Sequence, residues 1–311
     1  MTTLKSESKP NILFLYPKTG LDFGSTIAPP HALLAVAAPL LKAGYSVKLL
    51  DQRTHIITAQ TLRNYLSGDT ICVGVSTMTG TQIRNALILA QMVRDLTGGK
   101  IPIVWGGCHP SVAPEQTLEN DKVDIVVSGE GDETFLDLVR ALDQKRDLNT
   151  VKGIYYKDGG RRMQTPPRPL LDVETLLPTP WELIDVEKYI HQDMYLKASS
   201  RVLDIGQTSR GCPFHCGFCS SVTIRQRKWR AMSAEKSLDM IIDHVKRFNL
   251  NGIWLRDDEF YIDRARATAI CEGMIKANLN ICFYTSGTRV DVFLKASDYD
   301  IDVLKRAGAY T

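Results

Sequence analysis

The sequence predicts an α/β protein built from two successive sets of parallel βα units. Short β-branched runs alternate with stretches of helical periodicity between residues 11 and 142, and again from residue 201 to 311, a pattern that indicates βα units. With 311 residues, of which 44% are hydrophobic and 23% charged, the chain is long enough for two globular domains. Its net charge of +3 is too small to indicate nucleic acid or a membrane surface as a partner.

The first domain, expected over residues 11–142, contains five candidate strands. They are NILFLYP, SVKLLD, TICVGVS, IPIVWGG and VDIVVSG, beginning at residues 11, 46, 70, 101 and 123. Between them, the stretch from Ile83 to Leu96 places apolar side chains on one helical face and ends before Gly98 and Gly99, which is typical of a helix and its C-terminal cap. This pattern predicts a Rossmann-like sheet with its ligand crevice at the carboxyl ends of the strands.

The segments outside this sheet differ in composition. Residues 1–10 are polar and are expected to be disordered. Residues 143–200 are interpreted as a connector that contains a hairpin, VKGIYYKDGGRRMQ, and a proline-rich stretch. The absence of a leader pattern and the odd number of cysteines, seven, favour a reducing cytoplasm. The longest apolar run, from Ala32 to Leu41, is far shorter than the roughly 20 residues of a membrane span.

The second half, residues 201–311, predicts part of a βα barrel. Strands are expected at VLDIGQTS, GIWLRDD and ICFYTS, helices at 234–248, 263–276 and 298–307, and a further strand is expected to begin at Gly308. A closed eight-stranded barrel takes about 200 residues or more. We therefore expect a truncated or split gene product, with an open edge strand and an exposed apolar face.

Three of the seven cysteines fall in RGCPFHCGFCSS, where Cys212, Cys216 and Cys219 are spaced x3 and then x2. A four-iron cluster normally takes four thiolates, so three leave one iron open, as a catalytic metal requires. The alternative, a zinc knuckle, needs two close-spaced cysteine pairs, and the chain has no second pair of that spacing. Buried, unliganded thiols are expected at Cys72, Cys271 and Cys282.

The loop from Cys212 to Cys219 resembles the C-x3-C-x2-C loop of the radical S-adenosylmethionine (SAM) superfamily, including the aromatic Phe218 before the last cysteine. It follows a strand and precedes a helix expected to begin near Ser233, which is where active sites of βα barrels lie. The resemblance implies that the three cysteines act in catalysis through a [4Fe-4S] cluster and that SAM binds the free iron. It also implies reductive cleavage of SAM to a 5′-deoxyadenosyl radical, with Phe218 against the adenine.

Further SAM contacts are expected after the next two strands. Asp257, Asp258 and Glu259 stand where many members of the superfamily carry Gly-Gly-Glu, and carboxylates there would accept the methionine ammonium. The sequence does not decide which of the three carboxylates binds the ammonium. It also leaves open the alternative that they form a solvated acidic loop. Arg289 could clamp the SAM carboxylate, bind substrate or be an ordinary surface arginine. The basic run IRQRKWR, residues 224–230, is interpreted as a solvated face rather than a nucleic-acid site.

A Rossmann-like domain before a radical SAM half is similar to the cobalamin-binding radical SAM proteins. WGGCHPSVAPEQTLEN, VDIVVSGEGDETFLDLV and PPHALLAVAAPLLKAGYSVKLLD carry this resemblance. It implies that the first sheet binds cobalamin, with glycines allowing close approach of the corrin and hydroxyls serving the nucleotide tail. The expected cobalamin contacts are Ser76, Thr77, Thr79, Gly106, Gly107, Gly129, Glu130 and Gly131.

Two departures from related motifs shape this interpretation. The Asp-x-His-x-x-Gly motif of cobalamin-dependent mutases is absent, so no histidine is expected at the lower face of the corrin; His31, His55 and His109 lie outside that frame. The sequence GEGDET follows the fifth strand rather than the first, and its acidic residues would repel a pyrophosphate. A nicotinamide cofactor is therefore not expected.

The resemblance implies a cobalamin-dependent radical SAM enzyme, most simply a methyltransferase acting on an unactivated carbon of a small molecule. Its expected partners are an electron donor such as flavodoxin or ferredoxin and the missing barrel half as a separate chain. Alternatives left open are a cyclase of the anaerobic magnesium-protoporphyrin ester cyclase type and a non-catalytic fragment that binds cobalamin or a partner. A tRNA methylthiotransferase is disfavoured, because those enzymes carry three further cluster cysteines in the first domain, where this chain has only Cys72 and Cys108.

Overall fold

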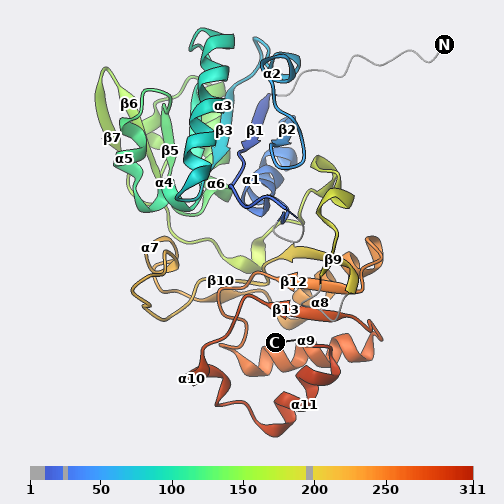
Figure 1. Cartoon of the computed structure of the whole chain (residues 1–311). Helices are drawn as coiled ribbons and strands as arrows, with labels where there is room; N and C mark the ends of the chain where they lie inside the picture. The colour runs from blue at the N-terminus through green and yellow to red at the C-terminus, as the bar shows by residue number, and fades with distance from the viewer. Residues whose placement is uncertain (1–10, 24–26, 194–198, 311) are drawn as a thin grey trace, which may run out of the picture. The chain divides into compact units, whose positions relative to one another are not determined.

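The computed structural model describes residues 11–23, 27–193 and 199–310, and the chain divides into two compact units (Figure 1). Unit 1 comprises the described residues up to 22 together with 30–170 and 177–184, and unit 2 comprises 171–176, the described residues from 185 onward and the short segment around 27–29. The predicted disorder of residues 1–10 lies outside the described residues.

Unit 1 is built on a seven-stranded sheet in the order β2-β1-β3-β4-β5-β6-β7. Its first five strands pair in parallel: β1 (Ile12–Tyr16), β2 (Val47–Asp51), β3 (Cys72–Ser76), β4 (Ile103–Gly106) and β5 (Ile125–Val127). The order 2-1-3-4-5 is a doubly wound arrangement with its switch point between β1 and β3, which confirms the predicted Rossmann-like sheet. The hairpin expected in the connector, β6 (Ile154–Asp158) and β7 (Arg161–Gln164), adds two antiparallel strands to this sheet.

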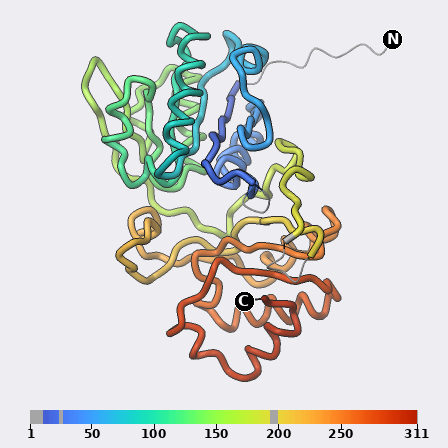
Figure 2. Tube along the Cα trace, in the orientation of Figure 1, coloured from blue at the N-terminus to red at the C-terminus, as the bar shows by residue number. Residues whose placement is uncertain are grey.

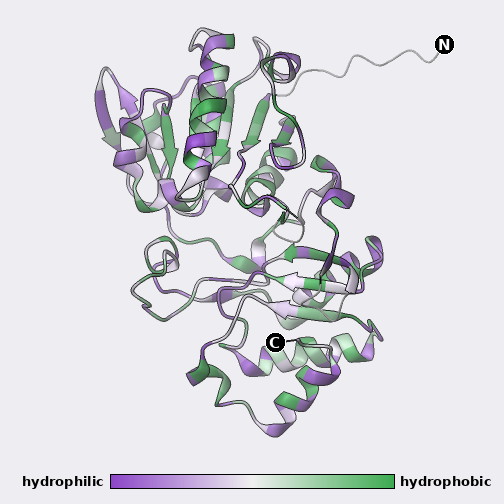
Figure 3. Ribbon diagram, in the orientation of Figure 1, coloured by the Kyte–Doolittle hydropathy of each residue, from purple (hydrophilic) through white to green (hydrophobic). Residues whose placement is uncertain are grey.

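Helices follow the strands of unit 1 and bury both faces of its sheet. They are α1 (His31–Lys42), α2 (Ala59–Tyr65), α3 (Thr81–Thr97), α4 (Cys108–Val112), α5 (Pro114–Glu119) and α6 (Gly131–Asp143). Helix α1 contacts α6, and α2 contacts α3. The strand β3 is buried at every position, as expected of a central parallel strand covered on both sides. Figure 3 shows the parallel strands of this sheet as largely hydrophobic, whereas the hairpin strands β6 and β7 at its edge are mainly hydrophilic.

Unit 2 contains a four-stranded sheet in the order β13-β12-β9-β8. Strands β9 (Ser199–Gly206), β12 (Gly252–Leu255) and β13 (Cys282–Thr285) are parallel, and β8 (His191–Asp193) is antiparallel to β9. The predicted strand at Gly308 is confirmed as a parallel bridge between Ala309 and Phe283. The chain can be followed from strand to helix and back through these units in Figure 2.

The helices of unit 2 match the predicted ranges closely: α8 (Ala234–Arg247), α9 (Arg264–Lys276) and α11 (Asp298–Arg306), with the short α7 (Ser221–Ile224) and α10 (Val290–Phe293). Side-chain caps explain three of these starts, because Ser233, Asp263 and Ser297 accept backbone N–H groups of the first turns. The remaining elements are the pair β10 (Ser209–Arg210) and β11 (Arg230–Ala231) and the 3₁₀ turns Leu148–Thr150, Val173–Thr175, Trp181–Leu183 and Val186–Tyr189.

Two of the three cysteines expected to be buried have that environment. Cys72 in β3 and Cys271 in α9 are buried, and burial raises the pKa of each thiol to about 12. Cys282, the first residue of β13, is only half-buried. No helix in the described part of the chain has the length and apolar character needed to cross a bilayer.

Candidate active site

The cysteine loop of unit 2 is closed at its base by a two-stranded ladder. Ser209 pairs with Ala231 and Arg210 with Arg230, so residues 211–229 form one loop beyond the carboxyl end of β9. Its three cysteines, Cys212, Cys216 and Cys219, are half-buried and free of disulfides. A tight turn links the last two, since the Cys219 N–H donates to the Cys216 carbonyl at 3.0 Å. Phe218 lies within this turn, and 93% of it is exposed.

Gly211, at the start of the loop, is required by its surroundings. Its φ is +90°, and a Cβ atom there would lie 2.1 Å from the carbonyl oxygen of Lys228. The side chain of Arg227 also folds back, donating from Nε to the carbonyl of Pro213 at 3.2 Å. The basic run 224–230 therefore contacts the start of the loop through Arg227, while Arg227 and Lys228 themselves remain exposed.

Asp258 joins the two ends of the cysteine segment by hydrogen bonds. Its Oδ2 accepts the Gly211 N–H at 2.9 Å and the Ser221 hydroxyl at 3.1 Å. These two donors lie on either side of the three cysteines in the sequence. The carboxylate therefore holds together the two ends of the cysteine segment, although Asp258 itself is exposed.

Asp257, unlike Asp258, is fully buried. It accepts hydrogen bonds from the Thr208 N–H at 3.3 Å, from the Thr208 hydroxyl at 2.9 Å and from the Ser209 hydroxyl. Burial raises the pKa of Asp257, opposed by these hydrogen bonds and by the charge of Arg266. Asp257 therefore supports the strand β10 that begins the loop.

The buried Arg266 of α9 completes this support. Its Nε donates to the carbonyl of Met232 at 2.6 Å, and its Nη2 donates to the carbonyl of Thr208 at 3.0 Å and to the Ser237 hydroxyl at 2.8 Å. The guanidinium thus links α8, α9 and the base of the cysteine loop. Nothing in the sequence marked this arginine, because its partners lie 29 to 58 residues away.

Glu259, of which 2% is exposed, organises the turn after β13. Its carboxylate accepts the Thr288 hydroxyl at 2.6 Å and the Arg289 N–H at 2.8 Å. Its backbone carbonyl accepts the Trp229 indole N–H at 3.1 Å. The three successive carboxylates are therefore all engaged by protein groups, and Asp258 is the exposed one.

Arg289 brings a positive charge to the loop. Its guanidinium lies 4.0 Å from the ring centroid of Phe214, and its Nη1 lies 3.5 Å from Cys216 Sγ. The Nε and Nη2 atoms of the same guanidinium pair with Asp291, Nε with Oδ1 at 2.9 Å and Nη2 with Oδ2 at 3.0 Å. Sequence reasoning identified Arg289 but missed both Phe214 and Asp291 as its neighbours.

The donor set fits an iron–sulfur cluster. Burial raises the pKa of the Cys212 thiol, and the nearby Asp258 and Glu259 carboxylates add to this effect, so a bound cation would be needed to hold it as a thiolate. Among the described residues, no three cysteine, histidine or acidic side chains converge on a single metal ion. Cluster thiolates each bind a different iron, so three half-buried thiols spread along one exposed loop suit a cluster.

The candidate cobalamin contacts of unit 1 gather at one edge of its sheet. Ser76 ends β3, Gly106 ends β4, and 129–131 follow β5. Gly107 has a φ of +98°, and a Cβ atom there would lie 2.8 Å from the Thr77 carbonyl oxygen. The loops after β3 and β4 therefore approach each other at backbone distance.

Two buried polar residues that sequence reasoning missed join the loops at this edge. Gln82 donates from Nε2 to the carbonyl of Pro17 at 3.0 Å and accepts the Met78 N–H at 2.7 Å, which links the loops after β1 and β3. Ser111 accepts the Gly129 N–H at 2.9 Å and donates to the carbonyl of Gly107 at 2.7 Å, which links those after β4 and β5.

This edge fits an extended cofactor with polar groups. The buried Thr77 Oγ1 has no hydrogen-bond partner among the described residues, and a Cβ atom on Gly129 would meet no atom within 4 Å. The Thr79 hydroxyl lies 3.1 Å from Nδ1 of His109, and burial lowers the pKa of that histidine. The edge thus offers open backbone, an unsatisfied hydroxyl and an imidazole.

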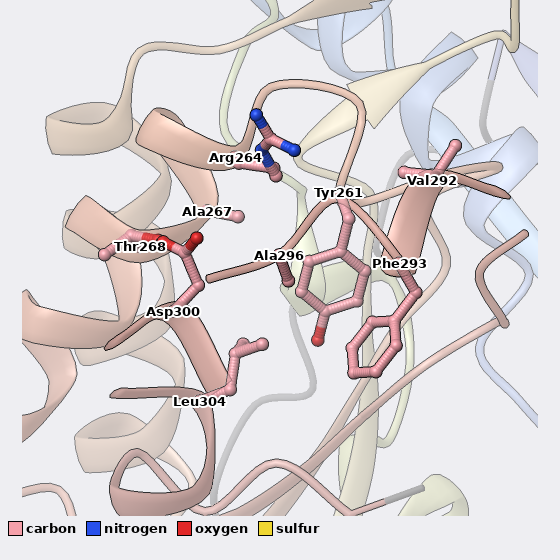
Figure 4. Close-up of a pocket in the computed structure, with 9 residues that line it drawn as sticks. All are labelled: Tyr261, Arg264, Ala267, Thr268, Val292, Phe293, Ala296, Asp300 and Leu304. Atoms are coloured by element: carbon pink, nitrogen blue, oxygen red, sulfur yellow. The ribbon is translucent and has the colours of Figure 1, made fainter. Parts of the chain in front are cut away.

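Unit 2 also contains a small pocket (Figure 4). It is lined by residues of α9, α10 and α11 together with Tyr261 and Ala296, and none of the candidate site residues is among them. Burial raises the pKa of Tyr261 above its ordinary value. We interpret this pocket as a packing gap between the helices.

Comparisons with known proteins agree with this geometry. The B12 binding domain family matches residues 24–139, and the radical SAM superfamily matches residues 207–311. An uncharacterized methyltransferase of Pyrococcus horikoshii is 30% identical over 289 residues, which cover 92% of this chain and 60% of that protein. The anaerobic magnesium-protoporphyrin IX monomethyl ester cyclase of Rubrivivax gelatinosus is 32% identical over 300 residues, which cover 91% and 51%.

A solved structure is similar over both units. The cobalamin-dependent SAM radical enzyme OxsB, with aqua-cobalamin and SAM bound, superposes with a TM-score of 0.74 at 25% identity, covering 97% of this chain and 43% of that one. The chain thus spans about half the length of the relatives it matches. The two family matches follow one another in chain order, so this chain carries a B12 binding domain followed by a radical SAM domain.

Proposed function

We propose that the chain provides the cluster, SAM and cobalamin sites of a cobalamin-dependent radical SAM methyltransferase that acts on an unactivated carbon of a small molecule. The observation that carries this proposal is the cysteine loop, with three free, half-buried thiols on one loop beyond the carboxyl end of β9. A [4Fe-4S] cluster bound there would supply the electron for reductive cleavage of SAM, and cobalamin would serve as the methyl carrier.

In this proposal each residue of the loop has a distinct task. Cys212, Cys216 and Cys219 each bind one iron and leave the fourth for SAM. Phe218, 93% exposed, offers its ring to the adenine. Asp258 is the exposed acidic side chain of its triplet and suits the methionine ammonium better than Asp257 and Glu259, which are buried.

Unit 1 would hold cobalamin at the carboxyl edge of its sheet. The glycines present backbone to the corrin, and the hydroxyls serve its polar substituents. The supporting observations are the unsatisfied Thr77 hydroxyl and the open space at Gly129. The proposed contacts are Ser76, Thr77, Thr79, Gly106, Gly107, Gly129, Glu130 and Gly131.

A cyclase is the second candidate, because the Rubrivivax cyclase is 32% identical to this chain. In that case the same cofactors would serve without methyl transfer. Isotope-labelled SAM separates the two: a methyltransferase passes the labelled methyl group to its product, whereas a cyclase leaves it on methionine.

The proposed setting is a reducing cytoplasm with a flavodoxin or ferredoxin as the electron donor. None of the seven cysteines forms a disulfide, as expected where thiols stay reduced. A reduced donor would deliver one electron to the cluster for each SAM that is cleaved.

Anaerobic reconstitution of the full chain tests the proposal. We expect about four irons and four sulfides per chain, 5′-deoxyadenosine on addition of SAM and dithionite, and hydroxocobalamin retained through gel filtration with a changed visible spectrum. A chain that binds iron but no corrinoid would contradict the cobalamin site, and a chain that binds neither would contradict the proposed function.

A further inference from the structure

We infer that Arg289 acts on the cluster itself: its guanidinium donates an N–H to the Cys216 thiolate and raises the reduction potential of the cluster. This inference rests on the proposed function, because it requires the cluster to bind at the cysteine loop. It assigns to Arg289 a role that does not depend on contact with SAM.

The guanidinium is held by two neighbours, and a third residue anchors its backbone. Its Nε and Nη2 edge pairs with both carboxylate oxygens of Asp291, at 2.9 and 3.0 Å, and its plane lies 4.0 Å from the Phe214 ring centroid. The Arg289 N–H also donates to Glu259 at 2.8 Å, which anchors the backbone. The remaining Nη1 corner then faces Cys216 Sγ at 3.5 Å.

The pairing with Asp291 limits what else this side chain can do. An arginine binds a carboxylate most strongly through two parallel N–H groups on one edge. In Arg289 the Nε edge is already used in this way by Asp291. The Nη1 nitrogen that is left over lies 3.5 Å from the Cys216 sulfur.

A donor at this position must favour the reduced cluster. Reduction adds one negative charge, which is shared by the cluster and its thiolate ligands. Hydrogen bonds to the sulfurs and nearby positive charge stabilise that charge and raise the potential. The side chain of Arg289 is 40% exposed, so solvent screens part of the effect, but its hydrogen bond acts at contact distance.

Redox titration of the reconstituted chain without SAM, followed by electron paramagnetic resonance, tests this inference. Arg289→Met should make reduction about tenfold less favourable, the equivalent of one charge-assisted hydrogen bond, which is about 59 mV for a one-electron couple. Arg289→Lys keeps the positive charge but lacks the forked guanidinium, so its reduction potential should lie between those of Arg289→Met and the parent. Lys276→Met is the matched control, because it removes a positive charge at the C-terminal end of α9, remote from the carboxyl ends of the strands.

Each result has a clear meaning. A lower reduction potential in Arg289→Met, with no such change in Lys276→Met, supports the inference, provided that the iron content and circular dichroism of both variants match the parent. An unchanged potential, with or without weaker SAM binding, would overturn it and leave the proposed function standing. A parent chain that takes up no cluster would overturn the proposed function, and with it this inference.

Discussion

The Asp258 carboxylate lies 2.9 Å from the Gly211 backbone nitrogen, and this hydrogen bond joins the loop after β12 to the start of the cysteine loop. The same Oδ2 atom accepts the Ser221 hydroxyl at 3.1 Å. One exposed side chain thus sets the distance between the two ends of the segment that carries all three proposed iron ligands.

Asp258→Ala is expected to loosen this segment without unfolding the protein. The change removes two hydrogen bonds to a charged group, each worth about 1.5–3 kcal/mol at most and less at an exposed site. Iron occupancy after reconstitution and desalting should fall severalfold, while circular dichroism of the apoprotein stays the same. Asp239→Ala, at an exposed position on α8, is the matched control. Equal iron occupancy in both variants would contradict the conclusion that Asp258 holds the two ends of the cysteine segment together.

Gly211→Ala is expected to damage the loop more than any other glycine change within it. A left-handed backbone costs a non-glycine residue about 1–2 kcal/mol, and the added Cβ atom would also collide with the Lys228 carbonyl oxygen at 2.1 Å. Both the melting temperature and cluster uptake should fall. Gly217→Ala, in the same loop with no atom within 4 Å of its Cβ position, should change neither; similar losses in the two variants would rule out the steric explanation.

Asp257 predicts a specific dependence of stability on pH. Its pKa in the folded protein is raised above the ordinary value of 3.8 by burial. The stability it contributes is therefore fully present below the unfolded pKa and is lost as pH rises through the folded pKa. Urea unfolding from about pH 4 to about pH 8 should show the parent losing free energy of unfolding relative to Asp257→Asn. A difference that stays constant with pH would mean that the folded pKa is not raised.

Gly107→Ala is expected to weaken cobalamin binding in unit 1. With φ at +98° and a Cβ position 2.8 Å from the Thr77 carbonyl oxygen, alanine would push apart the loops after β3 and β4. Hydroxocobalamin retention should drop at least tenfold, while cluster uptake in unit 2 stays unchanged. Gly68→Ala, near the amino end of β3 where a Cβ atom meets nothing within 4 Å, should retain cobalamin like the parent.

Local patterns were enough to predict the βα units and the cysteine loop. The runs around β1 to β5, the helix from Thr81 to Thr97 and the strand start at Gly308 depend on residues close in the sequence. The C-x3-C-x2-C spacing is equally local. Such features are readable without a structure, because period and spacing alone define them.

The roles of the three carboxylates could not be predicted, because each depends on distant partners. Asp257 meets Thr208 49 residues away, and Glu259 meets Arg289 30 residues away. All three carboxylates follow β12, which ends at Leu255, so strand alternation did not reveal which of them would be buried. The position of Asp291 beside Arg289 likewise became meaningful only when Cys216, 73 residues from Arg289, was brought next to it.

Mössbauer spectroscopy of the chain reconstituted with ⁵⁷Fe, recorded before and after SAM is added, tests most directly whether Cys212, Cys216 and Cys219 leave one iron open. We predict about four irons per chain, about one quarter of whose signal changes when SAM binds, and loss of the four-iron signal in Cys216→Ala. A spectrum in which no iron signal changes when SAM is added, or a complete four-iron cluster in Cys216→Ala, would contradict this account.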